Sequence, residues 1–315
     1  MNKKIVILAL HLGTGGAERV ICNVANLLSE KFDVKIISTY RLSETPSFYI
    51  NPNIEIEYLI DDLKPNRKEI KDSIREHKPI NLIKELIKSI KVLYLKKHRM
   101  IKKIKSLDCD IVISTRIFHN KLVGKYAKRN IIKIAQEHND NNNKKYIKRL
   151  IKSLKNIDYF MPISKELFSF YKTKLKTPAV VFIPNFIEQM PVKKADLTKK
   201  QIISVGRLDK IKRFDDLIDI FNKFQKKHPD WCLHIIGDGP EKEELQNKVN
   251  ELNLNNKITF CGTMLSDELE TEYMNSSVFA MTSDSESFGL VLVEAASYGL
   301  PLIAFNSARR CKRNN

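Results

Sequence analysis

Two glutamates eight positions apart, Glu286 and Glu294, stand near the end of the chain in the stretch ESFGLVLVEAASYGLPLIAF. The stretch reads as a loop, an amphipathic helix and a Gly-Pro stop before a buried strand. Phe288, Gly289 and Leu290 would bring backbone N–H groups to the helix start, where unpaired donors and the helix dipole favour an anion. The stretch therefore predicts an anion site flanked by two acids; two surface glutamates on an ordinary helix are the alternative.

Two cations occupy a strand-to-helix turn within the segment IISVGRLDKIKRFDDLIDIF, residues 202–221. A β-branched strand ends at Gly206, and Arg207 and Lys212 flank the turn that follows. Such a pair can hold a diphosphate from two sides, each charge-assisted hydrogen bond contributing about 1.5–3 kcal/mol. In a chain with 55 lysines and arginines, two solvated loop cations are the alternative.

Glycine-rich turns follow two further strands. Residues 5–10 form an apolar run that leads through HLGTGGAERV, with Gly15 and Gly16, into a helix. This is how open α/β sheets hold phosphorylated ligands, although the spacing is not the G-x-G-x-x-G of dinucleotide-binding proteins. Residues 234–245, HIIGDGPEKEEL, give a strand, a turn at Gly237 and an acidic helix start. Alone, that segment is only a good helix start.

In this order along the chain, these segments resemble the retaining glycosyltransferases of family four, whose Glu-x7-Glu motif matches Glu286 and Glu294. The resemblance implies an α/β protein of the GT-B fold, with two Rossmann-like parallel-sheet domains facing a cleft. It implies transfer of a sugar, with retention, from a nucleotide sugar to a saccharide or lipid-linked acceptor. The expected setting is synthesis of a cell-surface polysaccharide such as lipopolysaccharide or capsule. A UDP-sugar is the first choice of donor, and no metal or other cofactor is expected.

The resemblance also implies individual roles. Glu286 would touch the donor sugar and act in catalysis, and Glu294 would bind the nucleotide ribose. The other donor-binding positions would surround the diphosphate and the base: Gly15, Gly16, Arg207, Lys212, Gly237, Phe288, Gly289 and Leu290.

The acceptor side offers fewer signals. His119 follows the strand expected at 110–114, at a position where the family often has a histidine or asparagine facing the cleft. It is the second catalytic candidate, and its neighbour Asn120 is an equal candidate for the acceptor side. His138, after the strand expected at 131–136, is a third. Histidines in such loops are more often caps or surface residues, which is the alternative for each.

The positive charge is concentrated in one region. Residues 67–155 hold 26 Lys and Arg against 8 Asp and Glu, which accounts for the whole net charge of +18. Basic amphipathic helices are expected at 80–107 and 144–155, and they suit an anionic membrane surface. A core-facing helix with a solvated basic back is the alternative. Nucleic acid is not expected as a partner, because no recognition fold appears and aromatic residues are not interleaved with the basic ones.

Cellular location follows from two absences. The five cysteines include no C-x-x-C pair, which suits a reducing cytoplasm and argues against zinc. No apolar run approaches the 18 residues of a membrane span. We therefore expect a cytoplasmic protein, peripheral at the inner face of the membrane.

Two domains are expected, an acceptor-side domain at 1–190 and a nucleotide-sugar-binding domain at 199–315. Strands alternating with helices indicate parallel sheets. The expected strands are 4–10, 33–39, 54–60, 110–114, 131–136, 157–163, 179–183, 201–205, 232–236, 257–261, 277–282 and 301–305. Residues 309–315, RRCKRNN, are wholly polar where the family continues with further strand and helix. This predicts an incomplete second domain, and a truncated, catalytically impaired remnant as the alternative function.

Overall fold

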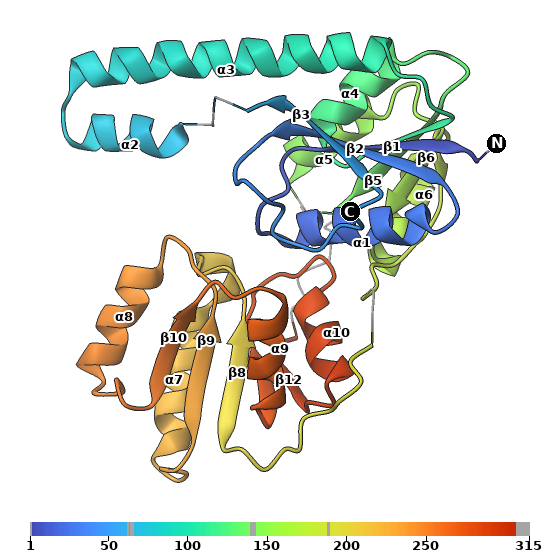
Figure 1. Ribbon diagram of the computed structural model, residues 1–315. Helices are drawn as coiled ribbons and strands as arrows, with labels where there is room; N and C mark the ends of the chain where they lie inside the picture. Colours follow the sequence, from blue (N-terminus) through green and yellow to red (C-terminus); the bar gives the residue numbers. More distant parts are fainter. Residues whose placement is uncertain (1, 62, 64–65, 139–142, 188–189, 307–315) are drawn as a thin grey trace. The chain divides into compact units, whose positions relative to one another are not determined.

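The computed structural model describes all residues except 1, 62, 64–65, 139–142, 188–189 and 307–315 (Figure 1). The chain divides into two compact units, unit 1 at Met1–Pro184 and unit 2 at Asn185–Asn315. The polar segment 309–315, on which the prediction of an incomplete second domain rests, lies outside the described residues. Within the described part of the chain, no helix is both long and apolar enough to cross a bilayer.

Unit 1 is built on a seven-stranded parallel sheet of order β3-β2-β1-β4-β5-β6-β7. Its central strands are apolar runs that are buried almost throughout, as expected for a parallel sheet covered on both faces. The strands are β1 (Lys4–Ala9), β2 (Asp33–Tyr40), β3 (Glu55–Ile60), β4 (Ile111–Ser114), β5 (Ile132–Glu137), β6 (Tyr159–Pro162) and β7 (Ala179–Val180). The helices are α1 (Gly16–Ser29), α2 (Arg67–Arg75), α3 (Pro79–Lys105), α4 (Ile117–Tyr126), α5 (Lys144–Ser153) and α6 (Lys165–Lys174).

Unit 2 has a five-stranded parallel sheet of order β10-β9-β8-β11-β12. The strands are β8 (Gln201–Val205), β9 (Cys232–Ile236), β10 (Ile258–Gly262), β11 (Val278–Met281) and β12 (Leu302–Ala304). A 3-10 turn, η1 (Lys210–Lys212), precedes the helices α7 (Phe214–Gln225), α8 (Lys242–Glu251), α9 (Ser266–Met274) and α10 (Leu290–Ser297). Each of the twelve strands expected from the sequence overlaps one of these twelve strands.

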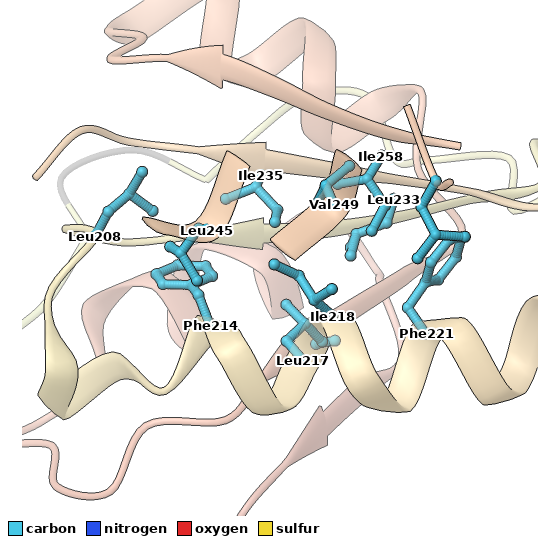
Figure 2. Close-up of a cluster of buried hydrophobic side chains, with 12 residues drawn as sticks. Leu208, Phe214, Leu217, Ile218, Phe221, Leu233, Ile235, Leu245, Val249 and Ile258 are labelled. Atoms are coloured by element: carbon cyan, nitrogen blue, oxygen red, sulfur yellow. The ribbon is translucent and has the colours of Figure 1, made fainter. Parts of the chain in front are cut away.

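One core of unit 2 lies between α7 and the sheet (Figure 2). Phe214, Leu217, Ile218 and Phe221 recur at helical spacing, so one side of α7 is apolar and packs against the strand residues Leu233, Ile235 and Ile258 of β9 and β10. This packing anchors the loop that leads from β8 into α7, which is where the expected diphosphate cations lie.

The strand order reverses at the same place in both sheets. In unit 1 the chain runs outward from β1 to β3 and then returns to β4 on the other side of β1, and unit 2 repeats this around β8 and β11. Open α/β sheets bind ligands beyond the carboxyl ends of the strands at such a reversal. Ligand sites are therefore expected at the carboxyl ends of β1 and β4 in unit 1, and of β8 and β11 in unit 2.

Candidate active site

The carboxyl edge of unit 2 brings two predicted site residues into contact. Lys212 of η1 forms an ion pair through Nζ with Glu286 Oε1, from the loop after β11. Ser283 Oγ donates to the same carboxylate oxygen at 2.8 Å. Thr282 Oγ1 contacts the carbonyl oxygens of Lys212 and Arg213 at 3.1 and 2.8 Å, which ties the two loops together. The expected diphosphate cation and sugar-contacting acid are thus neighbours.

The start of α10 has the backbone geometry of an anion site. Gly289 is its N-cap residue, with φ at 76°, and has no side chain with which to cap the helix. Only glycine adopts this left-handed conformation without strain. Within the first turn, the Leu292 N–H donates to the Gly289 carbonyl oxygen at 2.9 Å, whereas the N–H groups of Leu290 and Val291 come before the first carbonyl acceptors of the helix. The backbone at the start of α10 is therefore compatible with the predicted anion site.

The second glutamate lies in different surroundings. Glu294 is only 4% exposed, and Tyr273 of α9 donates its hydroxyl to Glu294 Oε2 at 3.2 Å. Tyr273 in turn stacks on Tyr298, with ring centroids 5.2 Å apart. The Glu294 carboxylate is thus held between α9 and α10, whereas Glu286 is held by Lys212.

Arg207 and Lys212 also differ in how firmly they are placed. The Arg207 side chain is 72% exposed, and its Nε lies 3.8 Å from Asp209 Oδ2, too far for a hydrogen bond. The Lys212 side chain is 23% exposed and fixed by Glu286. Lys212 is therefore positioned in advance, while Arg207 retains freedom to move.

Gly237 shapes the same edge through its backbone. Its φ is 138°, its N–H donates to the Gly262 carbonyl oxygen at 2.7 Å, and a Cβ at this position would lie 1.9 Å from the Gly206 carbonyl oxygen. The loops that follow β8 and β9 can lie this close only because residue 237 is glycine.

An open depression of about 1100 Å³ lies beside this edge, between α7 and α8. Acidic side chains, such as Glu241, Glu244 and Glu251, outnumber basic ones in its lining. An acidic lining does not suit a diphosphate, so we do not place the donor there.

The carboxyl edge of unit 1 is organised around an ion pair that the sequence analysis missed. Arg116 follows β4, and its Nη2 lies 2.6 Å from Glu18 Oε1 in the first turn of α1. The Glu18 side chain is 5% exposed, and His11 Nε2 lies 3.8 Å from the same oxygen. An arginine two residues beyond a buried strand, at the sheet reversal, is the signal that could have identified Arg116.

The two predicted glycines of unit 1 are not equivalent. Gly15 is the N-cap residue of α1, and a Cβ there would lie 2.3 Å from Glu18 Oε2. Gly16 begins the helix, and a Cβ there would have no heavy atom within 4 Å. A side chain at residue 15 would therefore displace the Glu18 carboxylate from its present position, whereas the space beside Gly16 is open.

His119 is fully buried and held in one tautomer. Its Nε2 lies 3.1 Å from Thr39 Oγ1, whose hydroxyl donates to the Ala9 carbonyl oxygen at 3.1 Å. The single hydroxyl proton is thus engaged, so His119 donates from Nε2 and keeps a lone pair on Nδ1. Nδ1 has no hydrogen-bond partner among the described residues. Burial, with Lys96 and Arg116 nearby, lowers the pKa of His119 to about 3, so the ring is neutral at physiological pH.

The other two acceptor-side candidates, His138 and Asn120, differ in their hydrogen bonds. His138, directly after β5, is buried, and within the described residues neither ring nitrogen has a hydrogen-bond partner. Burial, followed by the charge of Arg116, lowers the pKa of His138 to about 4. Asn120 accepts from Ser114 Oγ at 2.7 Å and donates to Ser153 Oγ at 3.5 Å. The structure therefore gives Asn120 a packing role that joins α4 to β4 and α5.

Comparison with known proteins agrees with this arrangement. The family model described as Glycosyl transferases group 1 matches residues 185–312. The chain is 30% identical over 318 residues to an uncharacterized glycosyltransferase of Haemophilus influenzae, covering 99% of this chain and 83% of that protein. It is 27% identical over 314 residues to a Campylobacter jejuni N-acetylgalactosamine-N,N'-diacetylbacillosaminyl-diphospho-undecaprenol 4-alpha-N-acetylgalactosaminyltransferase, covering 93% and 78%.

Solved structures establish the fold as GT-B. The lipopolysaccharide outer core galactosyltransferase WaaB in its apo form matches with a TM-score of 0.60 and 20% identity, covering 96% of this chain and 80% of that one. Anabaena HepE in complex with UDP-glucose matches with a TM-score of 0.69 and 16% identity, covering 98% and 82%. The family model and the Haemophilus relative, whose similarity extends over nearly the whole of this chain, show that the chain belongs to the group 1 glycosyl transferases.

Proposed function

We propose that this chain is a retaining glycosyltransferase that moves a sugar from a UDP-sugar to a saccharide or lipid-linked acceptor during synthesis of a cell-surface polysaccharide. The contact of Lys212 with Glu286, beside the left-handed Gly289 at the start of α10, carries the proposal. The Campylobacter relative is named for a diphospho-undecaprenol acceptor, and the structural neighbour HepE was solved with UDP-glucose. Both names support this choice of acceptor and donor.

On the donor side, we propose that three groups with positive charge or partial positive charge contact the diphosphate. Lys212 and Arg207 contribute side chains, and the first turn of α10 contributes backbone N–H groups. Donors that are already in place where charge develops on a leaving group lower the barrier without reorganisation. Lys212 fits this role best, because Glu286 and the loop contacts of Thr282 fix its position. These groups neutralise the leaving UDP, and the proposal includes no metal ion.

The two glutamates have separate roles in the proposal. Glu286 orients the donor sugar and stabilises the positive charge that develops on its ring as the bond to UDP breaks. Glu294 accepts hydrogen bonds from the ribose hydroxyls. Reaction on one face, with the leaving phosphate taking the acceptor proton, gives retention without the paired acid and nucleophile of a glycosidase.

The acceptor side of the proposal rests on neutral imidazoles. His119 and His138 are buried, and their lowered pKa values keep them uncharged, so each can accept a hydrogen bond from a sugar hydroxyl. Both are buried, so an acceptor would reach them only after neighbouring side chains move. Arg116 adds a cation at the same edge.

Turnover assays with labelled UDP- and GDP-sugars, followed by NMR of the product, test this function. A product with the same anomeric configuration as the donor, formed from a UDP-sugar, is the expected result. An inverted anomer would overturn the retaining mechanism, and turnover with GDP-sugars alone would overturn the choice of donor.

The membrane part of the proposal rests on α3. Seven of its apolar side chains are 45–70% exposed: Ile80, Ile83, Leu86, Ile87, Ile90, Leu93 and Tyr94. Most recur every three or four residues, so they share one side of the helix. Within unit 1, the long helix α3 extends beyond the sheet with α2 beside it (Figure 1). A core-facing helix would bury this side, so the exposed stripe favours docking on a surface.

Lysines beside the stripe suit an anionic bilayer. Lys84, Lys88 and Lys91 are exposed on α3. Apolar side chains entering the interface and cations near anionic headgroups act together, each cation contributing about 1 kcal/mol. We therefore propose that the protein works as a peripheral protein at the cytoplasmic face of the membrane, where a lipid-linked acceptor is available.

Vesicle co-sedimentation can separate the two contributions. Replacing Ile83, Ile87 and Ile90 with serine should abolish binding at all salt concentrations. Replacing Lys84 and Lys88 with glutamine should remove mainly the part of binding that salt weakens, because exposed charges are screened within about 8 Å at physiological ionic strength. Equal binding of wild-type protein to neutral and anionic vesicles would contradict the electrostatic part, and no binding to either would contradict membrane docking.

A further inference from the structure

A cluster of mixed chemistry lies on the sheet of unit 2, away from the Lys212–Glu286 pair. His234 of β9, Cys261 of β10 and Glu272 of α9 place their ligand-type atoms within 4.8 Å of one another. Among the residues that the structure describes, these three side chains form the one group of histidine, cysteine and acidic residues that lie close enough together to hold a metal ion. The three residues come from three elements, so their spacing in the sequence gives no sign of the cluster.

A local irregularity accompanies Cys261. His234 pairs with Thr259 and Ile235 with Phe260, but Ile236 pairs with Gly262, so Cys261 is the extra residue of a β-bulge. Bulges turn a side chain away from the direction that regular pairing would give it. In this strand the bulge accompanies a thiol that lies with groups from β9 and α9.

The carboxylate of the cluster is already oriented. Glu272 Oε2 lies 2.8 Å from His234 Nδ1 and accepts from Gln201 Nε2 at 3.0 Å. The bond from Gln201 is an outer hydrogen bond of the kind that holds ligands in place in known metal sites, whereas a bound ion would replace the direct contact between His234 and Glu272. The His234 and Glu272 side chains are 22% and 18% exposed, so an ion can reach them from solvent.

The charges of the cluster also favour a cation. Glu272 brings a carboxylate to the cluster, and the Cys261 thiol lies with it and donates to the Thr259 carbonyl oxygen at 3.7 Å. A divalent cation bound here would contact the Glu272 carboxylate and the Cys261 sulfur, which can ionise. Metal binding releases the thiol proton, so affinity should rise with pH.

We propose that His234, Cys261 and Glu272 bind a divalent transition metal, with zinc the best match. Zinc accepts imidazole nitrogen, thiolate sulfur and carboxylate oxygen together, and a water molecule completes four-coordination. The bound ion would join α9 to β9 and β10. Tyr273, the next residue on α9, donates to Glu294, so the ion would steady the α9–α10 contact without taking part in sugar transfer.

Titration of the full chain, freed of metal with a chelator, tests the proposal. Cobalt(II) is the first probe, because a thiolate ligand gives it a charge-transfer absorption band, and zinc is then added to displace it. Wild-type protein should show the band at one cobalt per chain and lose it on zinc addition. The variants Cys261→Ser and His234→Gln should each bind at least about tenfold more weakly, and Cys261→Ser should lack the band.

Cys109→Ser is the matched control. Cys109 is also a free cysteine, but it is buried in unit 1 and lies outside the cluster. This variant should keep the wild-type band. Zinc should raise the thermal midpoint of wild-type protein and Cys109→Ser, and leave that of Cys261→Ser unchanged. A wild-type titration without a thiolate band would overturn the proposal by itself, as would an undiminished band in Cys261→Ser.

Discussion

The two sheets share a strand order around their reversal points, and each has an ion pair there, but the groups around the two pairs differ. In unit 2, Lys212 and Glu286 meet in partly exposed loops, close in sequence to the left-handed Gly289 at the start of α10. In unit 1, Glu18 and Arg116 neutralise each other, and buried His119 and His138 stay uncharged. Topology therefore sets where a ligand can bind, and in the proposed function the side chains fit unit 2 to a diphosphate and unit 1 to neutral hydroxyl groups.

The largest effect should come from the acid of unit 2. Glu286→Gln should lower turnover by about 10²–10³-fold, the size seen when one electrostatic stabiliser is removed. Affinity for UDP should change little, because Lys212 keeps its charge. Steady-state kinetics measures the turnover, and titration with UDP measures the affinity. Glu251→Gln, which changes an exposed glutamate at the end of α8, is the control. Unchanged turnover in Glu286→Gln would contradict its catalytic role.

Replacing a glycine with alanine should affect the stability of the protein differently at the two edges. Gly237→Ala should lower the free energy of unfolding by about 2–4 kcal/mol, because its Cβ would meet the Gly206 carbonyl oxygen at 1.9 Å and its φ is left-handed. Gly16→Ala should leave stability unchanged or raise it by up to about 1 kcal/mol, because the space is open and alanine favours helix. Urea denaturation measures both. Equal losses would show that the edges are packed alike.

Acid should destabilise unit 1 through its buried histidines. The folded pKa values of His119 and His138 are about 3 and 4, below the ordinary 6.5, so the unfolded chain binds more protons below pH 6.5. Their contribution to stability is complete above pH 6.5 and falls as the pH drops towards 4, by up to about 1.4 kcal/mol per pH unit for each histidine. Urea denaturation between pH 7 and 5 should show a shallower decline in His138→Asn. An identical decline would mean that His138 is accessible to protons in the folded state.

The sequence predicted the sheets well because their strands are buried and parallel. Such strands are continuous apolar runs, which local reading detects, and every expected strand overlaps an observed one. The fold then confirmed the Rossmann-like arrangement of both units. Gly289, too, was identifiable, because the loop-to-helix motif that contains it is short.

Contacts between distant residues were not predictable. Arg116 and Glu18 are 98 positions apart and meet only because β4 returns beside β1. The cluster of His234, Cys261 and Glu272 likewise depends on which strands are neighbours. Periodicity predicted the helix at 80–107, but could not tell which of its sides the rest of the unit covers. Asn120 was a candidate as the neighbour of His119, and its hydrogen bonds to β4 and α5 could not be predicted from the sequence.

Calorimetric titration with UDP tests the central claim, a diphosphate site at the edge of unit 2, most directly. Wild-type protein should bind UDP, and Lys212→Ala and Arg207→Ala should each weaken binding by about 10- to 150-fold, the equivalent of one charge-assisted hydrogen bond. Lys223→Ala, which removes an exposed lysine of α7, should bind like wild type. Wild-type affinity in both the Lys212 and Arg207 variants would show that UDP, if bound, is held elsewhere, and would contradict the account.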